Sequence, residues 1–210
     1  MVSREEMTRA LEERHGKELQ EKLSAASVAV CGLGGLGSNI AVFLARAGVG
    51  RLLLFDFDRV EVSNLHRQQY RVSQVGMYKA DAMRENLMEV NPFCRVEALA
   101  ERITEENAKS LLMEADIVCE AFDEAEAKAM LADSVMAMKP EKYLVAASGM
   151  AGLGSANEIK TRKITENFYI CGDGKSDVKE TMGLVAPRVA VCAGHQAHMA
   201  LRLLAGRKAP

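Results

Sequence analysis

Mainly apolar runs of strand length alternate with helix-type patterns along most of the chain. Five such runs occupy residues 28–31, 51–56, 96–99, 117–120 and 143–147. Between them, apolar positions recur at helical spacing over residues 38–47, 77–89, 105–113 and 124–138. Continuous apolar runs are typical of strands that are buried on both faces of a parallel sheet. The β-α-β-α order therefore predicts an α/β, Rossmann-like, doubly wound fold with a mainly parallel sheet.

Both ends of the chain depart from this alternation. Residues 1–26 are charged and helix-forming, and we expect an amphipathic helix pair whose buried stripe is Leu11, Leu19 and Leu23. After residue 148, glycine-rich turns and shorter strand candidates predict an antiparallel extension of the sheet, followed by a last helix. These candidates are residues 158–164 and 168–171 for the strands and residues 189–205 for the helix.

The length of 210 residues favours one domain over two. We divide this single domain into a helical N-terminal segment (1–26), a core of alternating strands and helices (27–148) and a C-terminal segment (149–210) that carries the extension and the last helix. No internal repeat or low-complexity linker interrupts it.

Composition and charge exclude several classes of protein. About half of the residues are apolar (49%) and 27% are charged, which is the balance of a globular protein. The net charge of -2 gives no electrostatic reason to expect nucleic acid. We find neither a signal-peptide pattern nor an apolar run long enough to cross a bilayer, so we expect a cytoplasmic protein and no membrane partner. The five scattered cysteines lack any C-x-x-C pair, and we expect neither zinc nor disulfides.

A glycine cluster follows the first strand candidate and opens the first helix of the core. It contains the spacing G-x-G-x-x-G at Gly32, Gly34 and Gly37, with Gly35 inside it. Glycines let backbone N–H groups approach phosphate oxygens, and the helix N-terminus adds a partial positive charge. The loop predicts a nucleotide phosphate site, although glycines at these positions also simply allow a strand and a helix to pack closely.

Asp56 ends the second strand candidate, nineteen residues after Gly37. An acidic side chain in this position can accept hydrogen bonds from ribose hydroxyls. The glycine loop and Asp56 together serve NAD and ATP equally well.

Cationic groups and a further carboxylate favour ATP over NAD. Arg67 lies in the polar stretch after Asp56, and Lys79 opens the next helix. Such cations suit adenylylation, in which negative charge shifts onto the departing pyrophosphate. Asp123 follows the strand at 117–120, at the sheet edge where ligands of open α/β folds bind, and could hold Mg²⁺.

Each of these polar residues also has a structural interpretation. Arg67 and Lys79 could be solvated surface charges, and Asn64 could be a turn former. Asp123 could cap the next helix in a capping box with Glu126.

Taken together, the motifs resemble the ThiF/MoeB/ubiquitin-activating-enzyme superfamily. They are Gly32-Leu-Gly-Gly-Leu-Gly37, Leu54-Phe-Asp-Phe-Asp58, Ser63-Asn-Leu-His-Arg-Gln68, Lys79, Asn91-Pro92, Phe122-Asp123 and Gly183-Leu-Val-Ala-Pro187. The resemblance covers residues 24–206, and an ordered set of motifs is far more specific than the glycine loop alone.

The resemblance implies that Asp56 holds the ribose, that Asn64, Arg67 and Lys79 hold the phosphates, and that Asp123 binds magnesium. Members of the superfamily adenylate the C-terminal glycine carboxylate of a ubiquitin-fold protein such as ThiS or MoaD, and commonly work as homodimers. We therefore expect an ATP- and Mg²⁺-dependent adenylyltransferase, with thiamine biosynthesis as the pathway that short ThiF-type chains suggest. The candidate catalytic residues are Arg67, Lys79 and Asp123. The candidate nucleotide-binding residues are Gly32, Gly34, Gly35, Gly37, Asp56, Asp58, Asn64, Arg67, Gln68 and Lys79.

Two departures limit the resemblance. Many relatives carry paired C-x-x-C zinc motifs, which are absent here, and some carry a reactive cysteine in the stretch that corresponds to residues 177–182, where this chain has none. Cys171 is the nearest substitute, although an ordinary packed cysteine is the alternative. Several relatives also use an N-terminal arginine, sometimes from the other subunit, and the sequence does not choose between Arg9 and Arg14.

Three alternative functions are also compatible with the sequence. Another branch of the superfamily adenylates a carboxylate of a modified tRNA nucleoside, and the nearly neutral charge speaks mildly against RNA. An NAD-dependent oxidoreductase would share the glycine loop and Asp56. A non-catalytic binding module would keep the nucleotide pocket as a scaffold for a partner.

Overall fold

The apolar runs form the strands of one seven-stranded sheet. The computed structural model describes residues 2–181 and 183–210, and its strand order is β3-β2-β1-β4-β5-β7-β6. The strands are β1 Ser27–Cys31, β2 Arg51–Phe55, β3 Arg95–Leu99, β4 Ile117–Glu120, β5 Tyr143–Ala147, β6 Lys160–Lys163 and β7 Phe168–Gly172. Every residue of β1 and β4 is buried, as the continuous runs predict.

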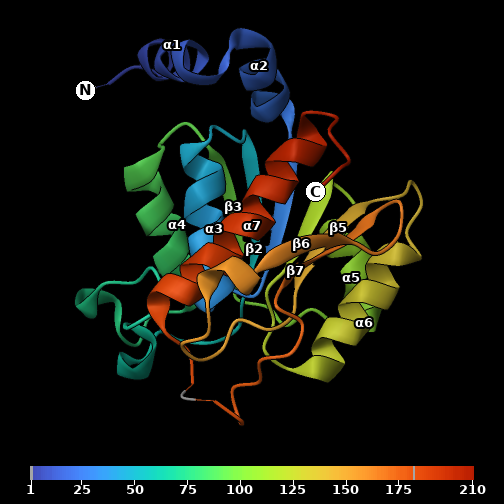
Figure 1. Cartoon of the computed structure of the whole chain (residues 1–210). Helices are drawn as coiled ribbons and strands as arrows, with labels where there is room; N and C mark the ends of the chain where they lie inside the picture. The colour runs from blue at the N-terminus through green and yellow to red at the C-terminus, as the bar shows by residue number, and fades with distance from the viewer. Residues whose placement is uncertain (1, 182) are drawn as a thin grey trace.

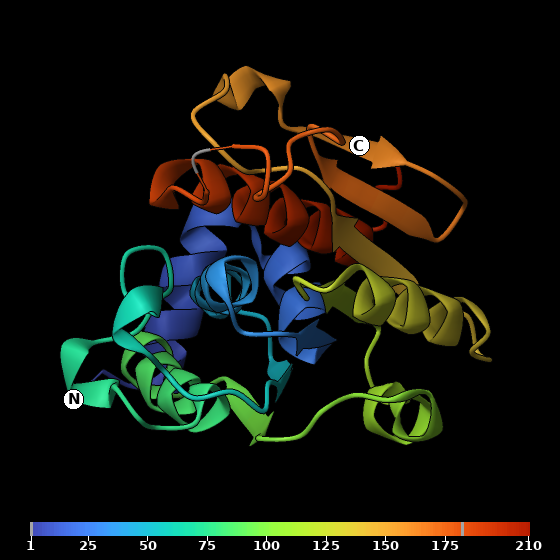
Figure 2. The same ribbon diagram turned by 90° about the horizontal axis from the view of Figure 1, so that it is seen from below.

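Helices cover both faces of this sheet. They are α1 Arg4–His15, α2 Lys17–Ala25, α3 Gly35–Arg46, α4 Lys79–Val90, α5 Glu105–Leu112, α6 Ala125–Met136 and α7 Ala186–Leu204. Figure 2 shows α3, α4 and α7 on one side of the sheet and α5 and α6 on the other. Alternate residues of β1 face the two helix layers. Val28 and Val30 belong to the core under α3 and α7, whereas Ala29 and Cys31 belong to the core under α5 and α6. The doubly wound α/β fold is confirmed.

The antiparallel extension is a hairpin at one edge of the sheet. β6 pairs antiparallel with β7, while β7 itself pairs in parallel with β5. The last helix begins at Ala186, three residues before its predicted start. Pro187 lies in the first turn of this helix, where a missing N–H removes no intrahelical hydrogen bond.

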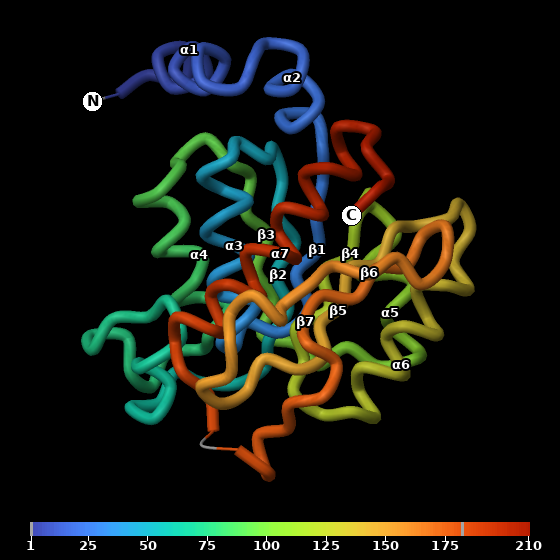
Figure 3. The backbone as a smooth tube through the Cα atoms, viewed as in Figure 1, coloured from blue at the N-terminus to red at the C-terminus, as the bar shows by residue number. Residues whose placement is uncertain are grey.

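The N-terminal helix pair forms as predicted, but its predicted stripe is wrong in part. Leu23 is buried, whereas Leu11 and Leu19 are only half-buried, and no residue of α1 is buried. Figures 1 and 3 show why, because α1 extends sideways beyond the body of the sheet and only α2 leads directly into β1. Both helices lie at the amino ends of the strands. No helix within the described ranges is long and apolar enough to cross a membrane.

Candidate functional site

The glycine loop joins the carboxyl end of β1 to α3, and its glycines have different structural reasons. Gly32 has φ +91°, and a Cβ there would lie 2.7 Å from the carbonyl oxygen of Ala121. A Cβ on Gly37 would overlap the carbonyl oxygen of Gly32. These two glycines are therefore explained by close packing, which is the structural interpretation of the motif.

Gly34 is not explained by packing. A Cβ there would meet no atom nearer than Nε2 of Gln68 at 3.9 Å. Gly34 is the N-cap of α3, so the space beside it adjoins the first N–H groups of the helix, which have no intrahelical partners. This arrangement leaves room for an anionic group at the start of α3.

Asp56 holds the glycine loop against the end of β2. Its Oδ2 accepts a hydrogen bond from the Leu33 N–H at 2.6 Å, and its Oδ1 accepts one from the Asp58 N–H at 2.8 Å. Burial raises the pKa of Asp56, and the nearby charge of Lys79 only partly opposes this effect. Each carboxylate oxygen keeps a second lone pair for another donor.

Lys79 is a buried, paired cation rather than a solvated surface charge. It is the first residue of α4 and is 7% exposed. Its Nζ lies 2.8 Å from Oδ2 of Asp58 and 3.9 Å from Oδ2 of Asp56. The structure thus brings together three of the predicted residues at the carboxyl end of β2.

Arg67 and Gln68 carry buried atoms that have no protein partner. They follow the short 3₁₀ turn Val62–Asn64 in the long loop after β2. Nε of Arg67 and Oε1 of Gln68 are buried and form no hydrogen bond with any described residue. Nη1 of Arg67 donates to the Ser63 carbonyl at 3.2 Å. Unsatisfied buried polar atoms are unusual in folded proteins, so these two atoms are candidates for contact with a bound ligand or with water.

Asn64 is a turn former, which is one of the two roles that the sequence allows for it. Its Oδ1 accepts from the Glu61 N–H at 3.1 Å, and its Nδ2 donates to Oγ of Ser63 at 3.3 Å. These bonds close the turn before Arg67. The side chain is only half-exposed, and its role toward phosphate stays a prediction.

Asp123 lies on the first exposed turn after β4. The capping interpretation is wrong, because the N-cap of α6 is Glu124 and no side chain caps that helix. Burial lowers the pKa of Arg67, and the negative charge of Asp123 opposes this shift. The two side chains are therefore within electrostatic range of one another, although they come from loops more than 50 residues apart in the sequence.

Sequence reasoning missed several residues that hold this site. The Tyr70 hydroxyl donates to the Leu33 carbonyl at 2.8 Å and so supports the glycine loop from the side of α4. Glu120 is 1% exposed at the end of β4, and burial raises its pKa against the opposing charge of Lys128. The signal for Glu120 was available, since a charged residue within a buried apolar strand needs a partner.

The cysteines and the N-terminal arginines lie outside the site. All five cysteines are buried and free, and burial raises the pKa of Cys171 to about 11 against a hydrogen bond with Thr161. Such a thiol is poorly suited to nucleophilic chemistry. Arg9 and Arg14 are exposed on α1, at the opposite end of the strands from the glycine loop (Figure 1).

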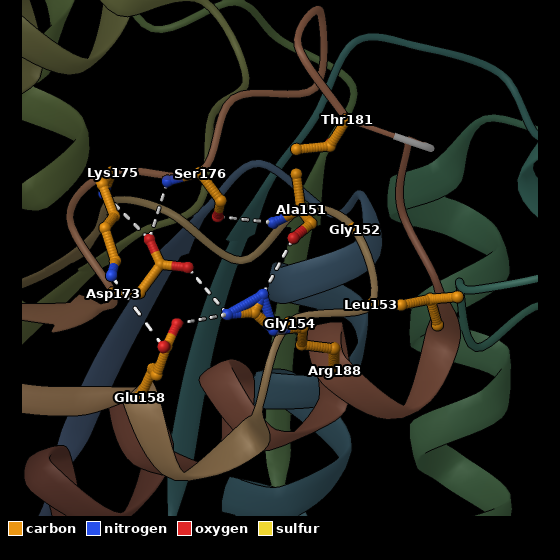
Figure 4. A pocket seen from close by; sticks show the side chains of 10 residues that line it. All are labelled: Ala151, Gly152, Leu153, Gly154, Glu158, Asp173, Lys175, Ser176, Thr181 and Arg188. Atoms are coloured by element: carbon orange, nitrogen blue, oxygen red, sulfur yellow. Dashed lines mark hydrogen bonds and ion pairs between the residues drawn. The ribbon is translucent and has the colours of Figure 1, made fainter.

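A cavity of about 380 Å³ lies between the segment at residues 151–158, the segment at residues 173–181 and Arg188 in the first turn of α7. Arg188 forms its floor, with Nη2 2.7 Å from Oδ2 of Asp173 and Nη1 2.8 Å from the Ala151 carbonyl. Figure 4 shows Gly152 and Gly154 beside these groups. Burial alone would raise the pKa of Asp173, but backbone N–H donors and the charge of Arg188 lower it overall.

The cavity and the glycine loop share the first turn of α7. A Cβ on Gly35 would lie 3.1 Å from Cγ1 of Val189, the residue after Arg188. In addition, Nε2 of His66 lies 3.2 Å from the Leu184 carbonyl, just before the helix. The loop that carries Arg67 therefore contacts the segment just before α7, and the first turn of α7 carries Arg188 of the cavity.

Known proteins resemble this chain both in sequence and in fold. A sulfur carrier protein adenylyltransferase of Thermus thermophilus is 44% identical over 122 residues, which cover 58% of this chain and 45% of that protein. The ThiS adenylyltransferase of Escherichia coli K12 is 33% identical over 196 residues, covering 91% of this chain and 77% of that protein. The chain thus spans less than half the length of the Thermus relative.

Solved structures share the whole fold at low sequence identity. The E. coli tRNA N6-threonylcarbamoyladenosine dehydratase, TcdA, superposes with a TM-score of 0.86 at 23% identity, over 98% of both chains. The same enzyme in complex with ATP also gives 0.86 at 22% identity, over 98% of this chain and 97% of that one. The family model described as "ThiF family" matches residues 7–210. The chain therefore belongs to the ThiF family.

Proposed function

We propose that the protein is an ATP-dependent adenylyltransferase that activates the C-terminal carboxylate of a ubiquitin-fold, ThiS-like sulfur carrier protein. The names of the Thermus and E. coli relatives support this activity. The observation that carries the proposal is the pair of unsatisfied buried atoms on Arg67 and Gln68, next to the free space at Gly34. The phosphates of ATP offer acceptors for Nε of Arg67 and for the first N–H groups of α3, and the hydroxyl or amino groups of ATP offer donors for Oε1 of Gln68.

The residues of the site fit ATP in a definite order. The second lone pairs of Asp56 would accept from the ribose hydroxyls. The α3 N-terminus and Arg67 would hold the phosphates, with Gln68 near the same space. Asp123 is exposed and makes no hydrogen bond with a described residue, so its oxygens are free for Mg²⁺. A magnesium ion bound there would neutralise phosphate charge.

In this arrangement the acceptor carboxylate attacks the α-phosphorus of ATP. The bond from the α-phosphorus to the bridging oxygen breaks, and pyrophosphate leaves with the electron pair. Arg67 and Lys79 stabilise the charge that develops on the leaving group. The product is an acyl-adenylate that is ready for sulfur transfer. The rate arises from positioning and charge stabilisation, and no residue of the chain needs to form a covalent bond.

The cavity at Arg188 suits the last residues of a carrier protein. Gly152 and Gly154 line one wall of the cavity, and their lack of side chains leaves room for an extended peptide. A tail lying there would lead past Val189 toward Gly35 and so toward the α-phosphate. We propose this route for the acceptor.

The assembly and the pathway are also proposals. We propose a cytoplasmic homodimer that acts in thiamine biosynthesis. Because α1 lies at the far end of the strands, Arg9 or Arg14 could reach only the site of a second subunit (Figure 1).

A tRNA-nucleoside carboxylate is the second candidate acceptor. The fold shared with TcdA over nearly the full length of both chains favours it. The net charge of -2 offers little attraction for RNA, which is why we place the carrier protein first. An NAD-dependent oxidoreductase would leave Arg67 and Asp123 without a function.

The test is ATP–pyrophosphate exchange measured with a panel of purified carrier proteins and with tRNA. The exchange should require a carrier, and Arg67→Ala and Asp123→Ala should each reduce it by about 100-fold or more. Arg71→Ala is the matched control, since Arg71 lies in the same loop but pairs with Glu89 on the surface. Wild-type exchange by both site variants would refute the assignment, and exchange with tRNA alone would favour the second candidate.

A further inference from the structure

Glu120 and Lys128 form a partly buried ion pair that the mechanism above does not use; the Glu120 side chain is buried and the Lys128 side chain is 28% exposed. Glu120 ends β4 with a side chain that is 2% exposed, and Lys128 extends from the first turns of α6. Nζ of Lys128 lies 3.0 Å from both carboxylate oxygens. It also donates to the Ala147 carbonyl at the end of β5, at 3.2 Å. The pair thus connects two strand ends and one helix at the carboxyl edge of the sheet.

Stability alone is a weak explanation for this pair. Burying the Glu120 carboxylate has a desolvation cost, and an ion pair often repays such a cost only in part. The neighbouring strand residue Val118 and the helix residues Leu131 and Val135 show that apolar packing is available in this layer. A charged pair at this place therefore calls for a geometric reason.

The geometry of the turn after β4 supplies that reason. Oε1 of Glu120 accepts a hydrogen bond from the Phe122 N–H at 2.7 Å. On the opposite side, a Cβ at Gly32 would lie 2.7 Å from the Ala121 carbonyl oxygen and 3.1 Å from the Phe122 ring. The turn is thus fixed between the glycine loop and the ion pair.

Two further hydrogen bonds fix the backbone that leads into this turn. The Ala121 N–H donates to the Cys31 carbonyl at 2.8 Å, at the end of β1. Nε2 of Gln196 in α7 donates to the Glu120 carbonyl at 2.8 Å. Asp123 is the next residue after this constrained stretch, yet its own side chain makes no hydrogen bond within the described residues. Its position depends on the backbone before it.

We propose that the Glu120–Lys128 pair is a positioning device that sets the place of Asp123 relative to the glycine loop and thereby the affinity for magnesium-bound ATP. The inference rests on the proposed function, in which Asp123 holds the magnesium ion. Lys128 orients the Glu120 carboxylate, and the carboxylate holds the Phe122 N–H. Groups that orient a metal ligand in this way commonly change metal affinity about 10- to 100-fold when they are removed.

The test is the dissociation constant of ATP, measured by isothermal titration calorimetry with and without Mg²⁺. We call the ratio of the dissociation constant without Mg²⁺ to the dissociation constant with Mg²⁺ the magnesium gain. Lys128→Met should reduce this gain about 10-fold while metal-free ATP binding stays within about threefold. Lys128→Arg should keep most of the magnesium gain, because a guanidinium can still pair with Glu120. Lys139→Met is the control, since Lys139 forms an ion pair with Glu141 on the surface.

Asp123→Ala separates this inference from the proposed function. It should abolish the magnesium gain and leave metal-free binding intact. If Asp123→Ala loses the gain but Lys128→Met keeps it, the positioning role is refuted and the function stands. If Asp123→Ala keeps the gain, both the magnesium assignment and the positioning role fall. If Lys128→Met weakens metal-free and metal-bound ATP equally, the pair is only structural and the inference is refuted.

Discussion

Two buried glutamines, at opposite ends of the sheet, differ in how their polar atoms are satisfied. Gln20 in α2 lies at the amino ends of the strands, where its Oε1 contacts Nε2 of His15 at 2.7 Å. Its Nε2 donates to Oγ of Ser24 and to the Gly48 carbonyl. Gln68 lies at the carboxyl ends and is buried to a similar degree, but its Oε1 has no partner among the described residues.

The two edges of the sheet also differ in how many of their buried polar atoms are unsatisfied. An unsatisfied buried polar atom costs about 1–3 kcal/mol unless a ligand or water completes it. Four of the five residues with such atoms in the described ranges are Arg67, Gln68, Arg188 and Gln196, which lie toward the carboxyl edge; Ser27 is the exception. The amino edge is covered by α1 and α2, whereas the carboxyl edge carries most of the unsatisfied buried atoms among the described residues, as the proposed nucleotide site requires.

Two glycines should give the largest contrast between the edges. A Cβ on Gly50, at the amino end of β2, would overlap the Ser24 carbonyl oxygen, so Gly50→Ala should destabilise the fold by about 3 kcal/mol. Gly34→Ala has open space and should change the free energy of unfolding by no more than about 1 kcal/mol. Its methyl group should nevertheless weaken ATP binding about tenfold or more, as phosphate is displaced.

Urea unfolding and calorimetric ATP titration of both glycine variants measure this contrast. Tight ATP binding by the Gly34 variant would show that the phosphates lie elsewhere. A stable Gly50 variant would show that the amino edge is less closely packed than the distances indicate.

The glutamine pair gives a smaller and more specific contrast. Gln20→Ala removes three hydrogen bonds from a closed network, and it should lower the free energy of unfolding by about 1–3 kcal/mol without changing ATP affinity. Gln68→Ala should leave stability within about 1 kcal/mol and weaken ATP binding about fivefold. Urea unfolding and calorimetric ATP titration of both variants test this contrast. A loss of ATP affinity in Gln20→Ala together with a loss of stability in Gln68→Ala would contradict it.

The pH dependence of stability should show the smallest effect. Burial raises the pKa of Asp56, so the folded protein holds this proton in a range where the unfolded chain has already released it. The stability of the wild type relative to Asp56→Asn should therefore be highest below the ordinary aspartate pKa of 3.8, and should fall as the pH rises through the raised pKa. Urea unfolding of both proteins from pH 3 to pH 7 checks the sign, and a difference that increases with pH would contradict it.

Local patterns in the sequence predicted most of the fold and part of the site. Strand runs, helical spacing and the glycine loop depend on neighbouring residues, and Asp56 follows its strand directly, so these elements were predictable. Helical spacing shows which positions share a face, but it does not show whether the helix reaches the core. For this reason the predicted burial of Leu11 and Leu19 is wrong.

The remaining features depend on contacts between distant segments. The unsatisfied atoms of Arg67 and Gln68 arise from how one loop folds over another, which no local pattern records. The partner of Glu120 is a lysine eight residues later, at a position that is equally typical of a solvated helix face. Asn64 carries a residue type that suits both a turn and a phosphate contact, and the sequence alone does not separate the two roles.

A crystal structure of the protein with Mg²⁺ and a non-hydrolysable ATP analogue tests the central claim most directly. We predict phosphate oxygens in the open space beside Gly34 and within hydrogen-bonding distance of Arg67. The ribose should lie near Asp56, and the metal ion should bind to Asp123. A nucleotide that lies away from the glycine loop, with Nε of Arg67 and Oε1 of Gln68 still unpaired, would contradict it.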